Sequence, residues 1–531
     1  MTSTEKPKVF TRDATGLIRE LSVFDSFGVA FTGVGVISIF LFFSSFMTAA
    51  PTDNPLLSVV LMIIPLMALA AAWAYLMAVF PRSGGDYVYN TRAVNPALGV
   101  MTDFLYVSIL PSVLSVFAII AIQVFGDMFT IEGFLTGNSG LSAVATGLGD
   151  PNQQFVLVTL LTVLTAFFLV GRTKIYARFQ AFFVLAGIVA VIGLVAAMAA
   201  TSNSTYQMLL NQTFHVNYNT IIQNATAKGY VSPSLTGLSL YGTSFLVFWM
   251  AGPEYAAFVA GETKRPQRTG LISIVGAQVV VAILFVLVGL AAFSTFGIDF
   301  YYSVNYLVGQ GVYPLPTSQV TFLDLAVPLM GNPVIVGLVF TVIGVGAYLV
   351  GSNAVLAASR KIFAWSFDRL LPAKFADVSP RFGTPIYSSI LVSIIAEIFN
   401  YLIIYNVGIY NIVAGFSTVY STLIWGLSGL AAILLPFRKQ IFEQAPEFVR
   451  KKIAGMPVMS IIGAIAFVSI VGLLIFGQVI PSLQGTGVDP RPIVWTFGIF
   501  FGGLVYYYVV KWYRMKHGID LSLVYKQIPP E

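Results

Sequence analysis

The chain is a succession of long apolar runs separated by short polar segments. Most runs extend for roughly 20 residues, the length that a helix needs to cross the hydrocarbon core of a bilayer. We therefore predict an all-α integral membrane protein with about twelve transmembrane helices. The predicted spans lie at residues 22–46, 56–80, 99–125, 154–171, 176–200, 236–260, 270–297, 332–358, 385–405, 409–436, 456–480 and 491–513.

Positive charges alternate between the two sides of this arrangement. The tails and the even-numbered loops hold 26 of the 28 Lys and Arg residues, which leaves Lys228 and Arg491 for the opposite side. Cytoplasmic loops are enriched in Lys and Arg, so both termini are expected in the cytoplasm of a multi-pass protein of the cell membrane. The polar segment up to Glu20 has no apolar core with a small-residue cleavage site, and it is predicted to be a cytoplasmic tail.

The composition narrows the classes of function. Hydrophobic residues make up 57% of the chain and charged residues 9%, against roughly 25% charged in soluble domains. The chain has no cysteine and only two histidines, His215 and His517, so we expect neither a metal site nor a cofactor. The net charge of +6 reflects topology and not nucleic-acid binding. The expected partners are the lipid bilayer and a small-molecule substrate, with the oligomeric state left open.

One predicted span breaks in its middle. The apolar run 244–250 is followed by Ala251-Gly252-Pro253-Glu254, which places a helix breaker and an acid near mid-bilayer. Proline has no N–H to donate, so carbonyls before it lose their helical partners, and such groups persist in a membrane only when buried in protein or lining a cavity. We expect a discontinuous helix whose free carbonyls bind the cationic end of a substrate. A proline kink with a structural acid remains the alternative.

The first span carries a second irregularity. Gly28, Gly33 and Gly35 interrupt its apolar run. They are interpreted either as points of close packing against a neighbouring helix or as an unwound turn at 32–36 whose N–H groups face a carboxylate. The interrupted segments are spans 1 and 6, which occupy corresponding positions of two five-helix units. That pairing is typical of an inverted-repeat transporter with its site at the midplane.

This reading divides the chain into segments of different roles. The stretch 201–235 is predicted to be an extracellular loop, and whether its sequons at Asn203, Asn211 and Asn224 are glycosylated stays open. The expected segments are a cytoplasmic tail (1–20), a first repeat unit (21–200), the extracellular loop (201–235), a second repeat unit (236–436), two further helices (437–513) and a cytoplasmic tail (514–531).

Three motifs resemble a known family. FWMAGPEYAAFVAGETKRPQR at 248–268 looks like the sixth-helix signature of the amino acid-polyamine-organocation superfamily. PRSGGDYVYNTRAVNPALG at 81–99 is similar to the inner loop after helix 2 of that superfamily, and 356–385 resembles the loop after its helix 8. Three motifs in the right order over most of the chain indicate an amino acid permease of this superfamily.

The resemblance implies a five-plus-five inverted-repeat fold of the leucine-transporter type with discontinuous helices 1 and 6. It also implies secondary transport of amino acids or related amines by alternating access. The substrate carboxylate would meet backbone of the first break and the ammonium carbonyls of the second, with Phe248 or Trp249 as a moving gate. The candidate substrate-binding residues are Thr32, Gly33, Val34, Gly35, Phe248, Trp249, Met250, Ala251 and Gly252.

Four polar residues are candidates for coupling or gating: Glu254, Asp86, Ser352 and Asn353. Glu254 serves either to tie the helix start to neighbouring backbone or to couple an ion or proton. Asp86 is expected to pair with loop arginines as an inner latch. Some members of the superfamily carry a fifth-helix lysine in place of sodium, and the equivalent place here is Gly187. That departure leaves H⁺, Na⁺ or no ion open as the coupling partner.

Other acids fall inside or near predicted spans. Glu397 is expected to make a structural hydrogen bond, whereas Asp25 and Asp103 lie near span ends where water can reach them. The preferred interpretation is an amino acid permease. A polyamine or other organic-cation carrier of the same fold is the main alternative, and a membrane amino acid sensor is a further one. The chain contains none of the motifs HExxH and GxSxG, so we expect no enzyme.

Overall fold

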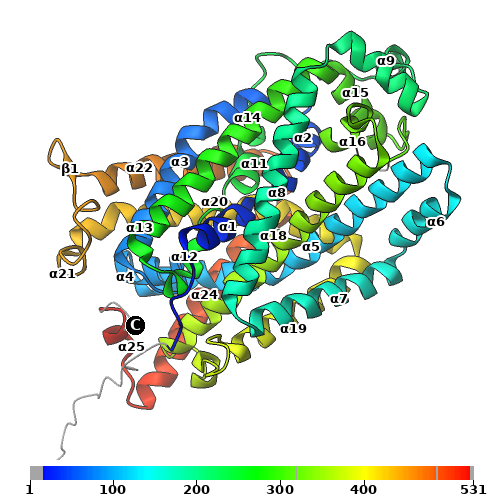
Figure 1. The fold of residues 1–531 in the computed structure, drawn as a ribbon. Helices are drawn as coiled ribbons and strands as arrows, with labels where there is room; N and C mark the ends of the chain where they lie inside the picture. Colours follow the sequence, from blue (N-terminus) through cyan, green and yellow to red (C-terminus); the bar gives the residue numbers. More distant parts are fainter. Residues whose placement is uncertain (1–15, 318–319, 486–487, 527–531) are drawn as a thin grey trace, which may run out of the picture.

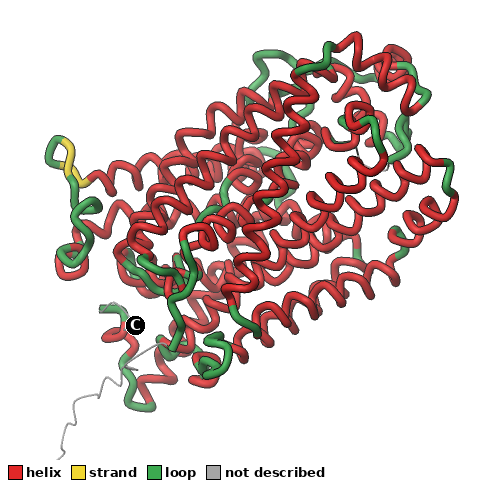
Figure 2. Tube along the Cα trace, viewed as in Figure 1, coloured by secondary structure: helices red, strands yellow, loops and turns green. Residues whose placement is uncertain are grey.

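The computed structural model describes residues 16–317, 320–485 and 488–526. In that part of the chain almost every segment is helical, and the strands are confined to one short hairpin (Figures 1 and 2). The predicted tails lie partly outside the described residues, at 1–15 and 527–531. The all-helical membrane architecture expected from the apolar runs is confirmed.

Eleven helical segments of the described chain are long and apolar enough to cross a membrane. The predicted sixth span is missing from this set because its helix α11 (Leu240–Met250) ends at the break. The eleven are Val23–Ala49, Pro55–Val79, Pro96–Thr136, Pro151–Val170, Thr173–Ala199, Pro266–Phe296, Pro333–Phe367, Ile386–Tyr405, Phe416–Phe437, Val458–Leu483 and Arg491–Lys516.

Four long helices begin with the same local chemistry. Each is preceded by Asn or Asp and has proline as its first helical residue, at Asn54-Pro55, Asn95-Pro96, Asp150-Pro151 and Asn332-Pro333. In every case the side-chain oxygen accepts a backbone N–H two residues further on, at 2.8–3.0 Å. Proline gives up only an N–H that has no helical partner at this position, so the pair defines the helix start.

The described residues up to 227 form ten α-helices, which Figure 1 labels in part. They are α1 (Val23–Val34), α2 (Val36–Ala49), α3 (Pro55–Val79), α4 (Asp86–Ala93), α5 (Pro96–Thr136), α6 (Ser139–Leu148), α7 (Pro151–Val170), α8 (Thr173–Ala199), α9 (Asn203–Phe214) and α10 (Tyr218–Ala227). The predicted loop 201–235 thus contains two helices of its own, which pack against the end of the bundle.

The described residues from 240 onward form both long and short helices. The elements up to α18 are α11 (Leu240–Met250), α12 (Tyr255–Phe258), η1 (Ala260–Glu262), α13 (Pro266–Gly270), η2 (Leu271–Val275), α14 (Gly276–Phe296), α15 (Ile298–Gly309), α16 (Phe322–Leu325), α17 (Val327–Met330) and α18 (Pro333–Phe367). The rest are η3 (Ala373–Ala376), α19 (Ile386–Tyr405), α20 (Val407–Leu434), η4 (Leu435–Phe437), α21 (Lys439–Phe442), β1 (Lys452–Ile453), β2 (Met456–Pro457), α22 (Val458–Gly472), η5 (Leu473–Val479), α23 (Ile480–Leu483), α24 (Arg491–Lys516) and α25 (Leu521–Val524).

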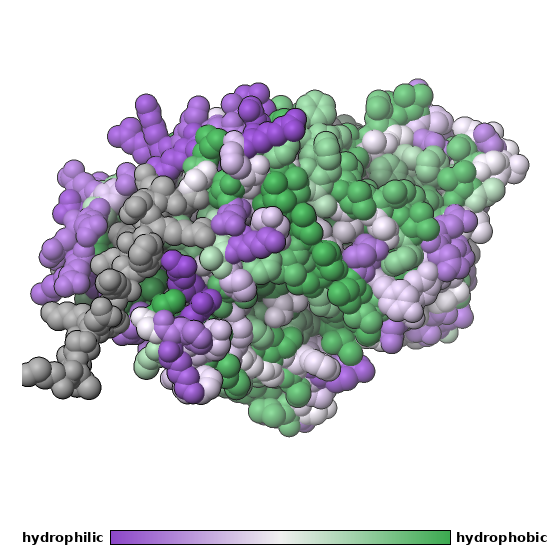
Figure 3. Space-filling model, turned by 90° about the horizontal axis from the view of Figure 1, so that it is seen from below, coloured by the Kyte–Doolittle hydropathy of each residue, from purple (hydrophilic) through white to green (hydrophobic). Residues whose placement is uncertain are grey.

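The surface of the bundle is apolar around its middle. Side chains such as Ile64, Phe167 and Phe182 are 64–72% exposed although they are hydrophobic. Figure 3 shows hydrophobic side chains gathered over the middle of one face and hydrophilic ones toward both ends. Exposed apolar surface of this extent is stable only against lipid, so it defines the belt that faces the bilayer.

The two ends of the bundle carry different short elements. One end holds α6, α9, α15 and α16, and the other holds α4, α12, α13, α21 and the hairpin (Figure 1). At the second end Leu21, just before α1, pairs with the segment after η1, because its N–H donates to Glu262 O (3.0 Å) and its carbonyl accepts from Lys264 N (2.9 Å). This end bears most of the basic loops, which the positive-inside rule expects on the cytoplasmic side, and on that expectation we call it the inner end.

Candidate functional site

The first helix is interrupted at a single residue. Gly35 has φ +71° and separates α1 from α2, while its N–H still donates to Phe31 O at 2.8 Å. A side chain there would be strained and its Cβ would run into Val350, so glycine is required. The break is narrower than the predicted turn at 32–36, since Thr32 to Val34 are helical. The first N–H groups of α2 nevertheless have no partner within the helix.

The interruption of the sixth helix is wider. Helix α11 ends at Met250, Ala251 is extended, Gly252 has φ +140° and α12 begins only at Tyr255. Pro253 has no N–H, so the carbonyl of Trp249 lacks its helical donor. The break predicted from Ala251-Gly252-Pro253-Glu254 is confirmed.

The two interruptions lie against each other. A Cβ built on Gly252 would lie 2.6 Å from the carbonyl carbon and oxygen of Gly33 and 2.9 Å from the N of Val34. A Cβ on Gly33 would in turn run into the carbonyl of Gly252 and lie 2.7 Å from the Tyr255 ring. Backbone therefore meets backbone at this crossing, and glycine is what permits the approach. The structure thus brings two predicted site residues of the first span, Gly33 and Val34, against a third, Gly252, which lies 218 or more residues further along the chain.

A cavity of about 210 Å³ lies beside the end of α11 that leads into the wider interruption. Its lining comes from α2, α5, α11 and α20 and is mostly aliphatic and aromatic, with Ser45, Ser112, Gln123 and Ser417 as neutral polar groups. Phe248 and Trp249 line the cavity, and their rings stand edge to face with centroids 5.2 Å apart. Other predicted site residues are buried away from it: Thr32 (2% exposed), Val34 (1%), Met250 (0%) and Ala251 (3%).

Glu254 lies in the wider break and is 3% exposed. Its Oε1 atom has no hydrogen-bond partner within the described chain. Tyr106, Tyr255 and Tyr420 are close enough to interact electrostatically with its carboxyl group, as is the Trp425 indole. Glu254 is therefore a buried acid surrounded by neutral aromatic donors, next to the crossing of the two interruptions.

Ser352 and Asn353 form a neutral polar contact between α18, α8 and α1. Tyr176 donates to Ser352 Oγ at 2.7 Å, and the Asn353 amide donates to the Val29 carbonyl at 3.0 Å. Gln180, which the sequence reasoning did not single out, lies beside Tyr176. Gly187 is elsewhere on α8, where a Cβ would lie 2.7 Å from Val36. The helix 1 carbonyl at this junction is thus satisfied by an amide.

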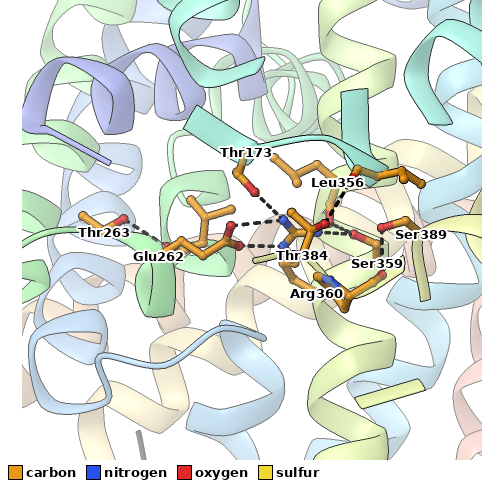
Figure 4. A network of polar contacts seen from close by, with 11 residues as sticks. Thr173, Glu262, Thr263, Leu356, Ser359, Arg360, Thr384 and Ser389 are labelled. Carbon is orange, nitrogen blue, oxygen red and sulfur yellow. Dashed lines mark hydrogen bonds and ion pairs between the residues drawn. The ribbon is translucent and has the colours of Figure 1, made fainter. Parts of the chain in front are cut away.

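Ionic contacts concentrate on the inner half of α18. Arg360 donates through Nε to Glu262 Oε1 (2.7 Å) and through Nη2 to Thr173 (2.8 Å), which joins α18 to η1 and α8 (Figure 4). Asp368, just after α18, accepts from Arg92 (2.8 Å) and from Tyr87 (2.7 Å). These contacts hold the inner end closed in this structure.

Lys361 forms the third ionic contact, with Asp86 and Asp103. The expected pairing of Asp86 with loop arginines is wrong, because its partner is this lysine while Arg92 of the same loop pairs with Asp368. The expectation that water reaches Asp25 and Asp103 is also wrong, since they are 2% and 0% exposed. Glu397 accepts from Thr159 (2.6 Å) and Asn400 (2.7 Å), as expected of a structural acid.

Sequence reasoning missed Lys361 because it was counted as a loop charge, although it lies inside α18. The available signal was the pair of an acid, Asp103, and a base, Lys361, each placed in or at the edge of an apolar run. A charge in such a position needs a partner of opposite sign.

Comparison with known proteins decides the family. The sequence profile of the family described as "Amino acid permease" matches residues 21–504. This chain belongs to the amino acid permease family. The resemblance to the amino acid-polyamine-organocation superfamily is thereby confirmed, and the chain is a multi-pass transporter and not an enzyme.

A relative in this permease family carries a more specific name. A Candida albicans protein named "Putative polyamine transporter" is 23% identical over 510 residues, which cover 92% of this chain and 83% of that protein. The family implies a substrate of the amino acid type.

Proposed function

We propose that this permease is a secondary active transporter that moves amino acids across the cell membrane by alternating access. The observation that carries the proposal is the crossing of Gly33 and Gly252, where two interrupted helices expose backbone groups to one another. An amino acid head group is a zwitterion, so it needs donors at one end and acceptors at the other. Interrupted helices supply both without a buried formal charge on the protein.

The substrate carboxylate is assigned to the N–H groups at the start of α2, next to Thr32, Gly33, Val34 and Gly35. The ammonium is assigned to the carbonyls around Phe248, Trp249, Met250, Ala251 and Gly252. Phe248 and Trp249 line the cavity beside the end of α11, which supports a role as the gate between cavity and substrate.

The proposal also includes the number of membrane crossings, the bounds of the repeat units and the side on which the termini lie. Counting α11 with α12 and η1 as one discontinuous span adds a twelfth crossing to the eleven candidate spans. The repeat units are then 21–200 and 236–436, followed by the helices of 437–513. Both termini lie in the cytoplasm, on the side that holds most Lys and Arg.

A polyamine or another organic cation is the second candidate substrate. It is favoured by the name of the Candida albicans relative and by Glu254, a buried acid at the break that suits an extra ammonium group. An amino acid carries a carboxylate that such a cation lacks. Only an amino acid therefore needs the N–H groups at the start of α2.

The test is uptake into proteoliposomes of a panel of radiolabelled amino acids and polyamines, with and without Na⁺ and pH gradients. Gly33→Leu and Gly252→Leu should abolish uptake of the preferred substrate, because each side chain would force the two backbones apart. Gly346→Ala is the matched control, since a Cβ on this glycine of α18 meets nothing within 4 Å.

Normal uptake by both leucine variants would refute the site, and uptake of no compound in the panel would refute the assignment to these substrates. A polyamine taken up in preference to every amino acid, with loss in Glu254→Gln, would establish the second candidate.

A further inference from the structure

Asp86, Asp103 and Lys361 form a closed ionic cluster, which we call the inner triad. They come from α4, α5 and α18 respectively, and all three side chains are 0% exposed. Lys361 Nζ bonds to Oδ1 of both carboxyl groups, and the Trp365 indole donates to the second oxygen of Asp103. The three elements are thereby tied together at the inner end.

The charges of the inner triad do not balance. Two carboxylates face one ammonium, whereas the neighbouring contacts Arg360–Glu262 and Arg92–Asp368 pair one cation with one anion. A surplus charge in a water-free interior is far less stable than a neutral cluster. One proton held on either carboxyl group makes the triad neutral.

The structure provides an atom on which that proton can sit. Asp86 Oδ2 is buried and has no hydrogen-bond partner within the described residues. A carboxylate oxygen without a donor is unfavourable in such surroundings, whereas a protonated one is neutral. Asp103 lacks such an atom, because Lys361 and Trp365 occupy its two oxygens.

The cover of the inner triad belongs to the interrupted sixth helix. Lys361 Nζ lies 4.9 Å from the ring centre of Phe258, the last residue of α12, and 4.5 Å from that of Tyr106. Phe258 also fills the space beside Gly85, the residue before Asp86. A displacement of α12 therefore uncovers the triad and admits water.

Titratable neighbours connect the inner triad with the cavity. The groups that interact with its carboxylates are Tyr89 of α4, Tyr106 of α5 and Glu254 of the break. Tyr106 also lies beside Tyr255, and beside Tyr420 with ring centres 6.2 Å apart. Tyr420 lines the cavity, so tyrosine rings extend from the cavity to the triad.

We propose that the inner triad is a proton-binding site whose occupancy is coupled to movement of α12, the part of the sixth span that follows the break. In the closed state one proton is bound to Oδ2 of Asp86. When α12 moves and water enters, that O–H bond breaks, water accepts the proton and Lys361 remains paired with two solvated carboxylates. The proton site stands on the ionic cluster itself, and only its coupling to transport rests on the proposed function.

The first test needs no substrate. Infrared titration of the purified protein should show a protonated-carboxyl C=O band at neutral pH that survives in Glu254→Gln and is lost in Asp103→Asn and in Asp86→Asn. Each of the last two variants leaves one carboxylate with one ammonium, a balanced pair that should fold. A band unchanged in both aspartate variants, or absent from the wild type, would overturn the proposal.

The second test separates coupling from transport. In proteoliposomes carrying a pH-sensitive dye, two rates are measured for the same labelled compound: uptake driven by a pH gradient and counterflow exchange. The ratio of the first rate to the second should collapse in Asp103→Asn, because gradient-driven uptake is lost while exchange remains. Glu397→Gln, an acid of α19 held by Thr159 and Asn400, is the control and should keep the wild-type ratio. An unchanged ratio in Asp103→Asn would overturn the coupling, whereas absence of counterflow in the wild type would refute the proposed function and leave the infrared result intact.

Discussion

The cavity and the inner end of the bundle are built from different side-chain chemistry. The cavity is lined by aliphatic and aromatic side chains with a few neutral polar groups. The inner end is closed by buried ions on one stretch of α18, at Arg360, Lys361 and Asp368. Buried ion pairs hold their elements in one arrangement while water is excluded, and they weaken once water enters. The ion pairs of the inner end therefore act as a latch between its elements, whereas the lining of the cavity carries no formal charge.

The difference between the cavity and the inner end predicts that cysteines introduced at the two places react differently with a thiol reagent. The chain has no native cysteine, so a single introduced cysteine reports accessibility without background. Ser45→Cys, in the lining of the cavity, should react with an impermeant maleimide added from outside. Ser26→Cys, fully buried in α1 and bonded to Ser273 at 3.0 Å, should stay unlabelled from either side. Rapid labelling of Ser26→Cys from the cytoplasmic side would show that the latch is open.

Removing the central ion of the latch should have the next largest effect. Arg360→Ala leaves Glu262 buried without its cation, a change that costs about 3–5 kcal/mol for buried pairs. We expect a large fall in thermal stability in detergent and the appearance of cytoplasmic labelling at Ser26→Cys in this background.

An exposed ion pair serves as the matched control for Arg360→Ala. Arg491 and Asp489 pair at 2.6 Å, but their side chains are 65% and 42% exposed. Arg491→Ala should leave the melting temperature and the labelling unchanged, because water and salt screen such pairs. Equal losses in the two variants would remove the distinction between the two ends.

The elements that local chemistry determines could be predicted from the sequence. The apolar runs predicted the long helices, and Ala251-Gly252-Pro253-Glu254 predicted the wider break, because proline and glycine act through their own backbone. The narrower break was harder to place, since only Gly35 leaves the helix and Gly33 serves close packing instead. The charge pairs of the inner end could not be predicted from the sequence. Asp86, Asp103 and Lys361 are up to 275 residues apart, and only the packing of α4, α5 and α18 shows which charge meets which.

A neutral contact marks the boundary between the two ends. Asn353→Ala removes a buried amide N–H that donates to the Val29 carbonyl in addition to the helical N–H of Gly33, and loss of such a hydrogen bond costs about 0.5–1.5 kcal/mol. We expect a smaller loss of thermal stability than in Arg360→Ala. Asn353→Asp tests the charge at this junction, because a carboxylate cannot donate to Val29 unless it is protonated. Its melting temperature should therefore fall further at neutral pH than at acidic pH, and a pH-independent loss would contradict the donor role of the amide.

A similarly small effect is expected where the latch keeps its ion pair and loses only one neutral donor. Tyr87→Phe deletes the hydroxyl that donates to Asp368 Oδ2 at 2.7 Å, while Arg92 still donates to both oxygens of that carboxylate at 2.8 and 3.0 Å. Because the charge stays paired, the loss should be near the lower limit for a hydrogen bond to a charged group, about 1.5 kcal/mol. Tyr508→Phe, at a side chain that is 56% exposed, is the control and should not change the melting temperature. A loss in Tyr87→Phe as large as that in Arg360→Ala would mean that neutral hydrogen bonds, and not ions, close the inner end.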